Sequence, residues 1–164
     1  MTEQEFERAA RVYGNMIYRV ACHAVGSRTD AEDVTQTVLL RLYEYAGTFQ
    51  SEEHQKHWLL RVAVNESRKE LRSLWRRRTV PLDEEWDAPA PERTDRTEVL
   101  QAVMALERKY RLTICLYYYE GCSVKEIAQL LKARPSTVQT WLQRARNKLR
   151  IALSDEEEPD YVRP

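Results

Sequence analysis

Residues 123–150 read SVKEIAQLLKARPSTVQTWLQRARNKLR, and their pattern predicts two helices joined by a tight turn. Ser123 and Glu126 form the S-x-x-E pattern of a capping box, which marks the start of the first helix. Pro135 fits the first turn of a helix, where its missing N–H loses no hydrogen bond, so the second helix should start near residues 134–136. Apolar residues recur at helical spacing in both segments, namely Val124, Ile127, Ala128 and Leu131, then Val138, Leu142, Ala145 and Leu149.

The second of these helices is strongly basic. Residues 132–150 contain six Lys or Arg side chains and no acidic one. A short helix, a tight turn and a basic second helix are typical of a helix-turn-helix, in which early residues of the second helix contact base edges and later basic residues contact phosphates. The alternative is a helical hairpin whose basic face is merely solvated, but such a face usually mixes both signs of charge.

The zero net charge of the 164-residue chain hides a strong segregation of charge along it. Residues 61–80 hold seven basic and two acidic side chains, whereas residues 82–98 hold seven acidic and two basic ones. This order suggests two nucleic-acid surfaces separated by a segment that avoids nucleic acid. Because helical periodicity dominates and no strand-like alternation runs far, we predict an all-α fold of two small helical domains joined by a flexible acidic linker.

The expected domain boundaries follow these changes of composition. The front domain should span 1–78, the linker 79–96, the back domain 97–153, and an acidic, disordered tail 154–164. In the front domain the periodicity predicts helices over 4–25, 30–45 and 57–78, with a second capping box at Thr29 and Glu32 and a polar loop over 46–55. In the back domain it predicts helices over 97–109 and 110–119 ahead of the helix-turn-helix, with buried residues that include Val99, Val103, Leu106, Leu112, Cys115, Leu116 and Tyr119.

The sequence offers no catalytic, metal or cofactor site. The three histidines do not cluster with carboxylates at the spacing of a metal site or a catalytic triad, and we expect neither an enzyme nor a bound cofactor. The three cysteines, Cys22, Cys115 and Cys122, are expected to be buried free thiols, with a redox or zinc role as the alternative. No signal peptide precedes the first helix and no apolar run approaches the ~20 residues of a membrane span, so a cytoplasmic protein without membrane insertion is expected.

Two features of the front domain point to partners. The helix over 30–45 shows Leu40 on its outer face, which leaves more apolar surface than one core requires, so either a third helix or a partner covers it. The helix over 57–78 is basic and follows a loop that contains Phe49, an arrangement that suits single-stranded nucleic acid. The alternative for this helix is again a solvated basic face.

The order of these segments resembles that of a bacterial RNA polymerase sigma factor of the extracytoplasmic-function (ECF) group. DAEDVTQTVLLRLYE, residues 30–44, is similar to the family's core-binding helix, and HWLLRVAVNESRKELR, residues 57–72, is similar to its helix for the promoter −10 element. Residues 120–150 are similar to the region that reads the −35 element. The resemblance covers about residues 5–153, and it implies a factor that binds core RNA polymerase and directs promoter-specific initiation.

The resemblance assigns roles to individual residues. Residues that face the −35 duplex would be Pro135, Ser136, Thr137, Gln139, Thr140, Gln143 and Arg144, with Arg146 and Lys148 on phosphates. Residues that hold the melted −10 element would be Phe49, Lys56, Arg61, Asn65, Arg68 and Arg72, with the loop 47–54 capturing an unstacked base. Residues that dock on core polymerase would be Asp33, Gln36, Leu40 and Arg41. An anti-sigma protein is a further potential partner, because the family is commonly held inactive by one.

Two residues depart from the family pattern, and two other functions compete with the sigma-factor interpretation. Lys132 stands where the helix-turn-helix usually has a glycine, so it should take a left-handed conformation. Trp141 stands where an arginine is common, and packing on a neighbouring helix is favoured over stacking near DNA. A free-standing duplex-binding regulator would share the back domain but has no need for a second basic surface. A purely structural adaptor would leave both basic surfaces unexplained.

Overall fold

The computed structural model describes residues 1–77 and 95–157, and these residues form helices and connecting turns without a strand. The predicted linker lies mostly outside the described residues, as do residues 158–164 of the predicted tail. The elements in chain order are α1 (Glu3–Val25), α2 (Arg28–Glu44), α3 (Glu52–Arg77), α4 (Asp95–Met104), α5 (Arg108–Ile114), a π-helix η1 (Cys115–Tyr119), α6 (Val124–Leu131) and α7 (Pro135–Glu157). The all-α prediction is therefore confirmed.

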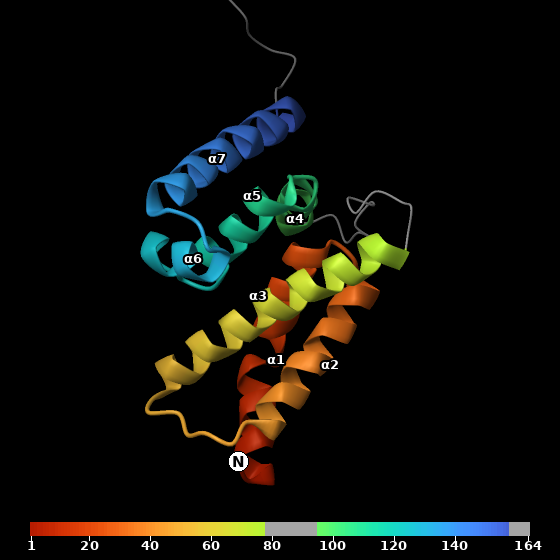
Figure 1. Cartoon of the computed structure of the whole chain (residues 1–164). Helices are drawn as coiled ribbons and strands as arrows, with labels where there is room; N and C mark the ends of the chain where they lie inside the picture. Colours follow the sequence, from red (N-terminus) through yellow and green to blue (C-terminus); the bar gives the residue numbers. More distant parts are fainter. Residues whose placement is uncertain (78–94, 158–164) are drawn as a thin grey trace, which may run out of the picture.

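Helices α1, α2 and α3 pack into a three-helix unit, the front bundle (Figure 1). Its core contains the apolar stripes expected from the sequence, with Ile17, Val38 and Leu59 completely buried. Each such side chain contributes roughly 1.5–3 kcal/mol by leaving water. Gly26 ends α1 in a left-handed conformation with φ 73°, which lets α2 turn back along α1.

Helices α4 to α7 form the back bundle, in which α6 and α7 are the predicted helix-turn-helix (Figure 1). Ile127 of α6 and Val138 of α7 are fully buried, and Leu142 is almost so. Lys132 ends α6 in the left-handed conformation expected for it, with φ 54° and ψ 45°. Trp141 is half-buried and packs against the core, which confirms the packing interpretation.

The two bundles lie against each other, and one continuous core runs through both. The contact joins α1 to α5 and η1, and α3 to α6, and we call it the seam (Figure 1). The sequence pattern did not predict this packing. It decides which basic side chains are available for a nucleic acid.

Several predicted boundaries and buried positions are wrong. Helix α3 begins at Glu52, five residues earlier than expected, because Ser51 accepts a hydrogen bond from His54 N–H at 3.0 Å and caps it. Helix α7 continues to Glu157, so the first residues of the predicted disordered tail are helical. The break between α4 and α5 falls near Ala105 instead of 109–110. Val99 and Tyr119, which we expected to be buried, are 38% and 47% exposed.

The predicted capping boxes are corrected in part. Ser123 does cap α6, since its hydroxyl accepts from Glu126 N–H at 3.1 Å, but the Glu126 carboxylate contacts His57 of α3 at 2.8 Å. Helix α2 starts at Arg28, two residues earlier than expected, and its cap is Ser27 instead of Thr29. A carboxylate expected to close a local box thus joins the two bundles.

Replacing Lys132 by glycine should stabilise the protein. A left-handed conformation costs an L-residue about 1–2 kcal/mol, and glycine avoids that cost, so the free energy of unfolding should rise by about 1 kcal/mol. The matched control is Lys125→Gly in the exposed face of α6, where glycine should lower it by about 1 kcal/mol. Urea unfolding of both variants checks this, and equal changes in the two would contradict it.

Candidate nucleic-acid interface

The outer face of α7 presents the residues predicted to contact the −35 duplex. Eight of these nine side chains are exposed, and only Thr137 is half-buried. The opposite face of the helix carries Val138, Leu142 and Ala145 into the core, so packing fixes which residues face outward. The polar face is continuous from Pro135 onward and free of acidic side chains up to Arg150.

The two later basic residues of this face are held by neighbouring side chains. Arg146 Nε donates to the Tyr118 hydroxyl at 2.6 Å, and its guanidinium lies 5.5 Å from the ring centres of Tyr117 and Tyr118. Lys148 Nζ lies 3.5 Å from a carboxylate oxygen of Glu107 and 5.2 Å from the Tyr110 ring centre. Aromatic rings orient Arg146 without neutralising it, which suits a phosphate contact.

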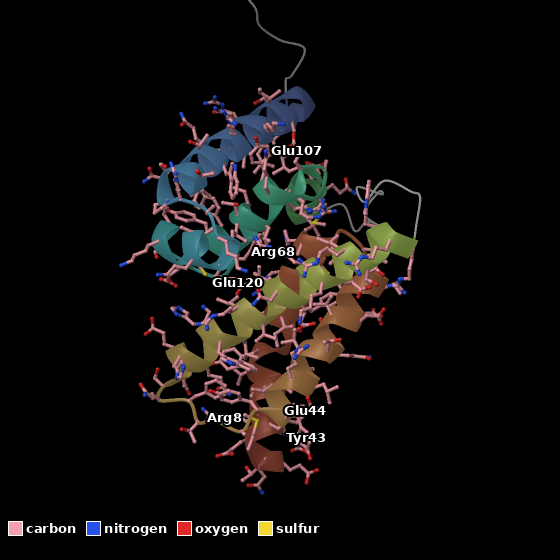
Figure 2. All side chains as sticks on the ribbon, in the orientation of Figure 1. Arg8, Tyr43, Glu44, Arg68, Glu107 and Glu120 are labelled. Carbon is pink, nitrogen blue, oxygen red and sulfur yellow. The ribbon has the colours of Figure 1, made fainter. Side chains whose placement is uncertain are left out.

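Helix α3 places the basic residues predicted for the −10 element along one side, but with unequal exposure. Arg61 and Arg72 are exposed, whereas Asn65 is half-buried. Arg68 and Lys56 are also half-buried, because both point into the seam (Arg68 is labelled in Figure 2). The structure therefore does not bring the predicted set together as one open surface.

The loop before α3 is built on a cluster of aromatic rings. Phe49 stacks on Tyr45 with ring centres 4.9 Å apart, and it meets Trp58 edge-on at 5.5 Å. His54 lies at the edge of Phe49 at 5.5 Å, and its Nδ1 accepts from Gln50 N–H at 3.1 Å. The loop is shorter than predicted, because Glu52 to His54 belong to α3. Phe49 is thus partly used in holding the loop.

The outer face of α2 carries the residues predicted to bind core polymerase, and all four are exposed. Leu40 is 57% exposed, so no third helix among the described residues covers it. Tyr43, one turn further along α2, is equally exposed (Figure 2). Its ring meets Phe6 edge-on at 5.3 Å. Arg41 forms an ion pair of 2.6 Å with Glu66 of α3.

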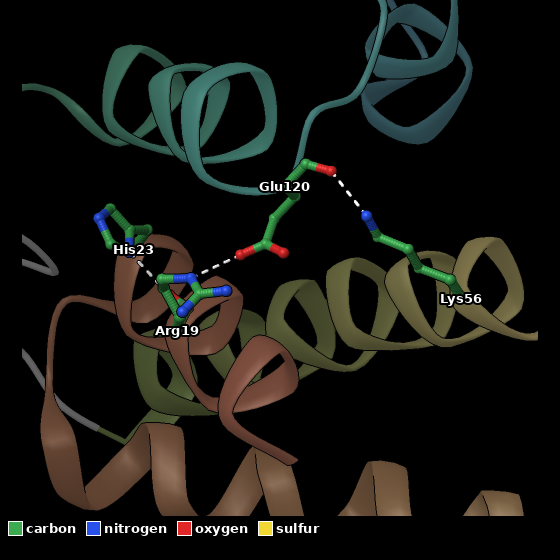
Figure 3. Close-up of polar contacts among 4 residues, drawn as sticks. All are labelled: Arg19, His23, Lys56 and Glu120. Atoms are coloured by element: carbon green, nitrogen blue, oxygen red, sulfur yellow. Dashed lines mark hydrogen bonds and ion pairs between the residues drawn. The ribbon is translucent and has the colours of Figure 1, made fainter. Parts of the chain in front are cut away.

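The sequence reasoning missed the residues that build the seam. Arg111 is 4% exposed, and its Nε donates to the His23 carbonyl at 2.6 Å. Glu120 is 5% exposed and accepts from Arg19 Nε at 2.5 Å (Figure 3). Periodicity within one helix cannot reveal that a charged residue is buried against another domain.

Burial sets the pKa values of the cysteines and of His23 near the seam. Desolvation raises the pKa of Cys22 and of Cys122 to about 11 and raises the pKa of Cys115 well above its ordinary value. The three cysteines are free and buried, as predicted, and these shifts disfavour the reactive thiolate. Desolvation likewise lowers the pKa of His23 to about 4, with the charges of Arg111 and Arg19 acting in the same direction.

The buried His23 should make the protein less stable in mild acid. Its folded-state pKa lies below the ordinary 6.5, so the unfolded chain takes up a proton first, and stability falls as the pH drops from 6.5 toward 4. Between pH 7 and pH 5 the free energy of unfolding should fall by about 2 kcal/mol from this cause. The variant His23→Asn keeps a donor for the Arg19 carbonyl but does not titrate. Urea unfolding at both pH values should show that the variant loses less unfolding free energy between pH 7 and pH 5 than the wild type. Equal losses would contradict the assignment of the pH dependence to His23.

One group of carboxylates in the described part of the chain lies close enough to surround a cation. Oxygens of Asp30, Asp33 and Glu70 fall within 4.8 Å of one another. Glu70 also pairs with Arg77 at 3.5 Å, so positive charge is already present there. Acidic side chains are common near the start of a helix, where α2 carries Asp30 and Asp33, so we assign this group no metal.

Comparison with known proteins identifies this arrangement. Residues 10–77 match the family model described as Sigma-70 region 2, and residues 96–149 match Sigma-70, region 4. The chain is 31% identical to RNA polymerase sigma-E factor of Streptomyces coelicolor over 156 residues, which cover 91% of this chain and 86% of the relative. The chain belongs to the ECF group of RNA polymerase sigma factors. A factor of this group directs promoter-specific transcription initiation.

Two further comparisons give a second relative in sequence and a similar fold. The sigma factor is 28% identical to ECF RNA polymerase sigma factor SigM of Mycobacterium tuberculosis over 148 residues, covering 88% of this chain and 74% of the relative. Its fold matches sigma factor RpoE of Bartonella quintana, solved with the anti-sigma factor NepR, at a TM-score of 0.72 and 22% identity, covering 92% of this chain and 98% of that chain. Within residues 1–77 and 95–157 no helix has both the length and the apolar character needed to traverse a membrane.

Proposed function

We propose that this sigma factor binds core polymerase and the two promoter elements through three separate surfaces. The outer face of α2 docks on core RNA polymerase, the exposed side of α3 with the Phe49 loop holds the melted −10 strand, and the outer face of α7 reads the −35 duplex. The protein contributes no catalytic group to RNA synthesis and acts in the cytoplasm with the polymerase. These assignments rest on the match to the family and on the exposure of the residues concerned.

The observation that carries the proposal is the placement of the α7 face. Its exposed residues between Pro135 and Lys148 are mostly basic or hydrogen-bonding, and they follow a helix-turn-helix turn. Lys148 contacts the Glu107 carboxylate at 3.5 Å, and Arg144 lies on the same face. Gln and Arg side chains at such positions can make bidentate contacts with adenine and guanine in the major groove. Phosphate contacts from Arg146 and Lys148 would then fix the register of the helix on the duplex.

The three surfaces can be separated by a binding experiment. Purified core polymerase should bind this protein, and the resulting holoenzyme should retain a fork-junction promoter probe that carries a duplex −35 element and a single-stranded −10 element. Protein without core should retain the probe far more weakly. Tight binding to a fully duplex operator by the free protein, together with no binding to core, would favour a free-standing regulator instead.

Regulation by an anti-sigma protein is part of this proposal. The RpoE structure, which has a similar fold, was solved in complex with the anti-sigma factor NepR. By analogy, an inhibitory partner of this sigma factor would cover surfaces on both bundles. Co-purification of such a partner from the native cell would support this proposal if it is lost when the α2 face is altered. Isolation of the sigma factor without any such partner at all growth stages would argue against it.

A further inference from the structure

Two tyrosines of the π-helix η1 flank one cation of the α7 face. Arg146 Nε donates to the Tyr118 hydroxyl at 2.6 Å, and the guanidinium carbon lies 5.5 Å from the ring centres of Tyr117 and Tyr118. We infer that the Tyr118 hydroxyl and the Arg146 guanidinium together bind one phosphate of the −35 duplex, so that Tyr118 is a DNA-binding residue outside the helix-turn-helix. This inference rests on the proposed function of α7.

Both members of this pair have hydrogen-bond donors to offer to an external acceptor. A tyrosine hydroxyl can accept one hydrogen bond and donate another. The Tyr118 hydroxyl accepts from Arg146, and within residues 1–77 and 95–157 no acceptor takes its own hydrogen. In the same part of the chain only the Nε of the Arg146 guanidinium is engaged in a hydrogen bond. Both side chains are exposed, so an oxygen of a bound ligand can reach the remaining donors.

The partners of Arg146 orient its charge without cancelling it. A hydroxyl and two aromatic rings are neutral, whereas Lys148 on the same helix lies 3.5 Å from a Glu107 carboxylate oxygen. Guanidinium groups form short and often bidentate hydrogen bonds with phosphate. Because Arg146 is held through Nε and keeps its full charge, its outer N–H groups suit a phosphate better than the ammonium group of Lys148 does.

The position of Arg146 along α7 fits a phosphate at the edge of the major groove. Eleven residues separate it from Pro135, or about 16 Å of helix at ~1.5 Å per residue. The major groove is about 12 Å wide and about 8.5 Å deep, so a helix whose first turns contact base edges reaches the DNA backbone after roughly this length. The Tyr118 hydroxyl contacts Arg146 and therefore lies at the same level.

The wide turn of η1 places two consecutive tyrosines against one guanidinium. Glu120 N–H donates to the Cys115 carbonyl at 3.1 Å, a bond that spans five residues. Such π-helical turns are rare and occur frequently at functional sites. The rings of Tyr117 and Tyr118 meet edge-on with their centres 4.9 Å apart. A helical turn and a neighbouring ring thus hold the Tyr118 hydroxyl in place, which limits the entropy lost when it binds a ligand.

Removing a single hydroxyl tests this contact. Holoenzyme formed with Tyr118→Phe should bind the fork-junction promoter probe about tenfold more weakly than the wild type, because a hydrogen bond to a charged acceptor is lost. Tyr117→Phe is the matched control, since the Tyr117 ring also flanks Arg146 but its hydroxyl does not bond to it. This control should bind like the wild type. Equal affinity of the wild type and Tyr118→Phe would overturn the inference.

A scan of the phosphates in the −35 element tests whether the two residues share one of them. Each phosphate in turn is replaced by an uncharged methylphosphonate. We expect one position at which the affinity of the wild-type holoenzyme falls about tenfold, and at that position both Tyr118→Phe and Arg146→Ala should lose clearly less. Different sensitive phosphates for the two variants, or no sensitive phosphate, would overturn the inference.

Two further measurements separate a direct contact from an effect through Arg146. Tyr118→Phe should leave the slope of log affinity against log salt unchanged because it removes no charge, whereas Arg146→Ala should reduce the slope by about one. In the Arg146→Ala background, Tyr118→Phe should still weaken binding by about threefold or more. If it has no effect there, the hydroxyl only orients the arginine, and the direct contact is wrong.

These outcomes are distinct from a failure of the proposed function. If the wild-type holoenzyme does not bind the probe, or if Arg144→Ala binds it equally well, the proposed function of α7 fails. If the wild type binds and Arg144→Ala weakens binding while Tyr118→Phe changes nothing, only the phosphate contact is wrong. Both phenylalanine variants should unfold at the urea concentration of the wild type, since each loses only one hydroxyl.

Discussion

Replacing Leu40 by aspartate is expected to lower the affinity of this sigma factor for core polymerase by about 30-fold. Leu40 is 57% exposed on α2 with Tyr43 beside it, and apolar anchors of this kind contribute about 2 kcal/mol or more when an interface buries them. A carboxylate placed there would lose that burial and would itself be desolvated without a partner.

The Leu40 prediction has a matched control in the same bundle. Val12 of α1 is 58% exposed, so Val12→Asp makes the same chemical change at equal exposure away from the α2 face. Sedimentation or fluorescence binding to core should separate the two variants. Equal affinity of both would contradict the docking face, and a milder loss is expected for Gln36→Ala on the same helix.

Removing the side chain of Arg144 should impair promoter recognition without impairing core binding. Arg144 is exposed on the outer face of α7, and a bidentate arginine–guanine contact is worth about 1–3 kcal/mol, or roughly 5- to 150-fold in affinity. Arg144→Ala should therefore reduce initiation at promoters with an intact −35 element by a factor in this range. Its affinity for core should stay within about twofold.

The control for Arg144 is Arg150→Ala. This substitution removes the same charge from the same helix. Arg150 contacts Asn147 at 3.0 Å and is not assigned to DNA. It should change initiation only slightly. Equal losses of core affinity and initiation in Arg144→Ala would show that this residue does not act through DNA.

Most of the fold could be predicted from the sequence because each helix carries its own signal. The apolar stripe of α7, the break at Pro135 and the left-handed Lys132 are local features, and all three agree with the structure. The surplus apolar surface at Leu40 was also visible, since it exceeds what one helix face needs to bury.

The arrangement of the candidate site was less accessible, since it depends on contacts between distant residues. Arg68 and Lys56 have the spacing and charge of DNA-binding residues, yet their acceptors lie 63 and 64 residues further along the chain. Glu126 illustrates the same limit, because its capping pattern is real but its carboxylate pairs with His57. The early start of α3 could have been found from Ser51 followed by two glutamates, a typical helix start.

Run-off transcription with purified core polymerase over a promoter library tests the central claim most directly. With this protein present, we expect initiation at a restricted set of sites that share two elements spaced as −35 and −10 sequences, and none of these transcripts without it. The sequences recovered would also define its specificity. No protein-dependent initiation, combined with tight duplex binding by the protein alone, would contradict its action as a sigma factor.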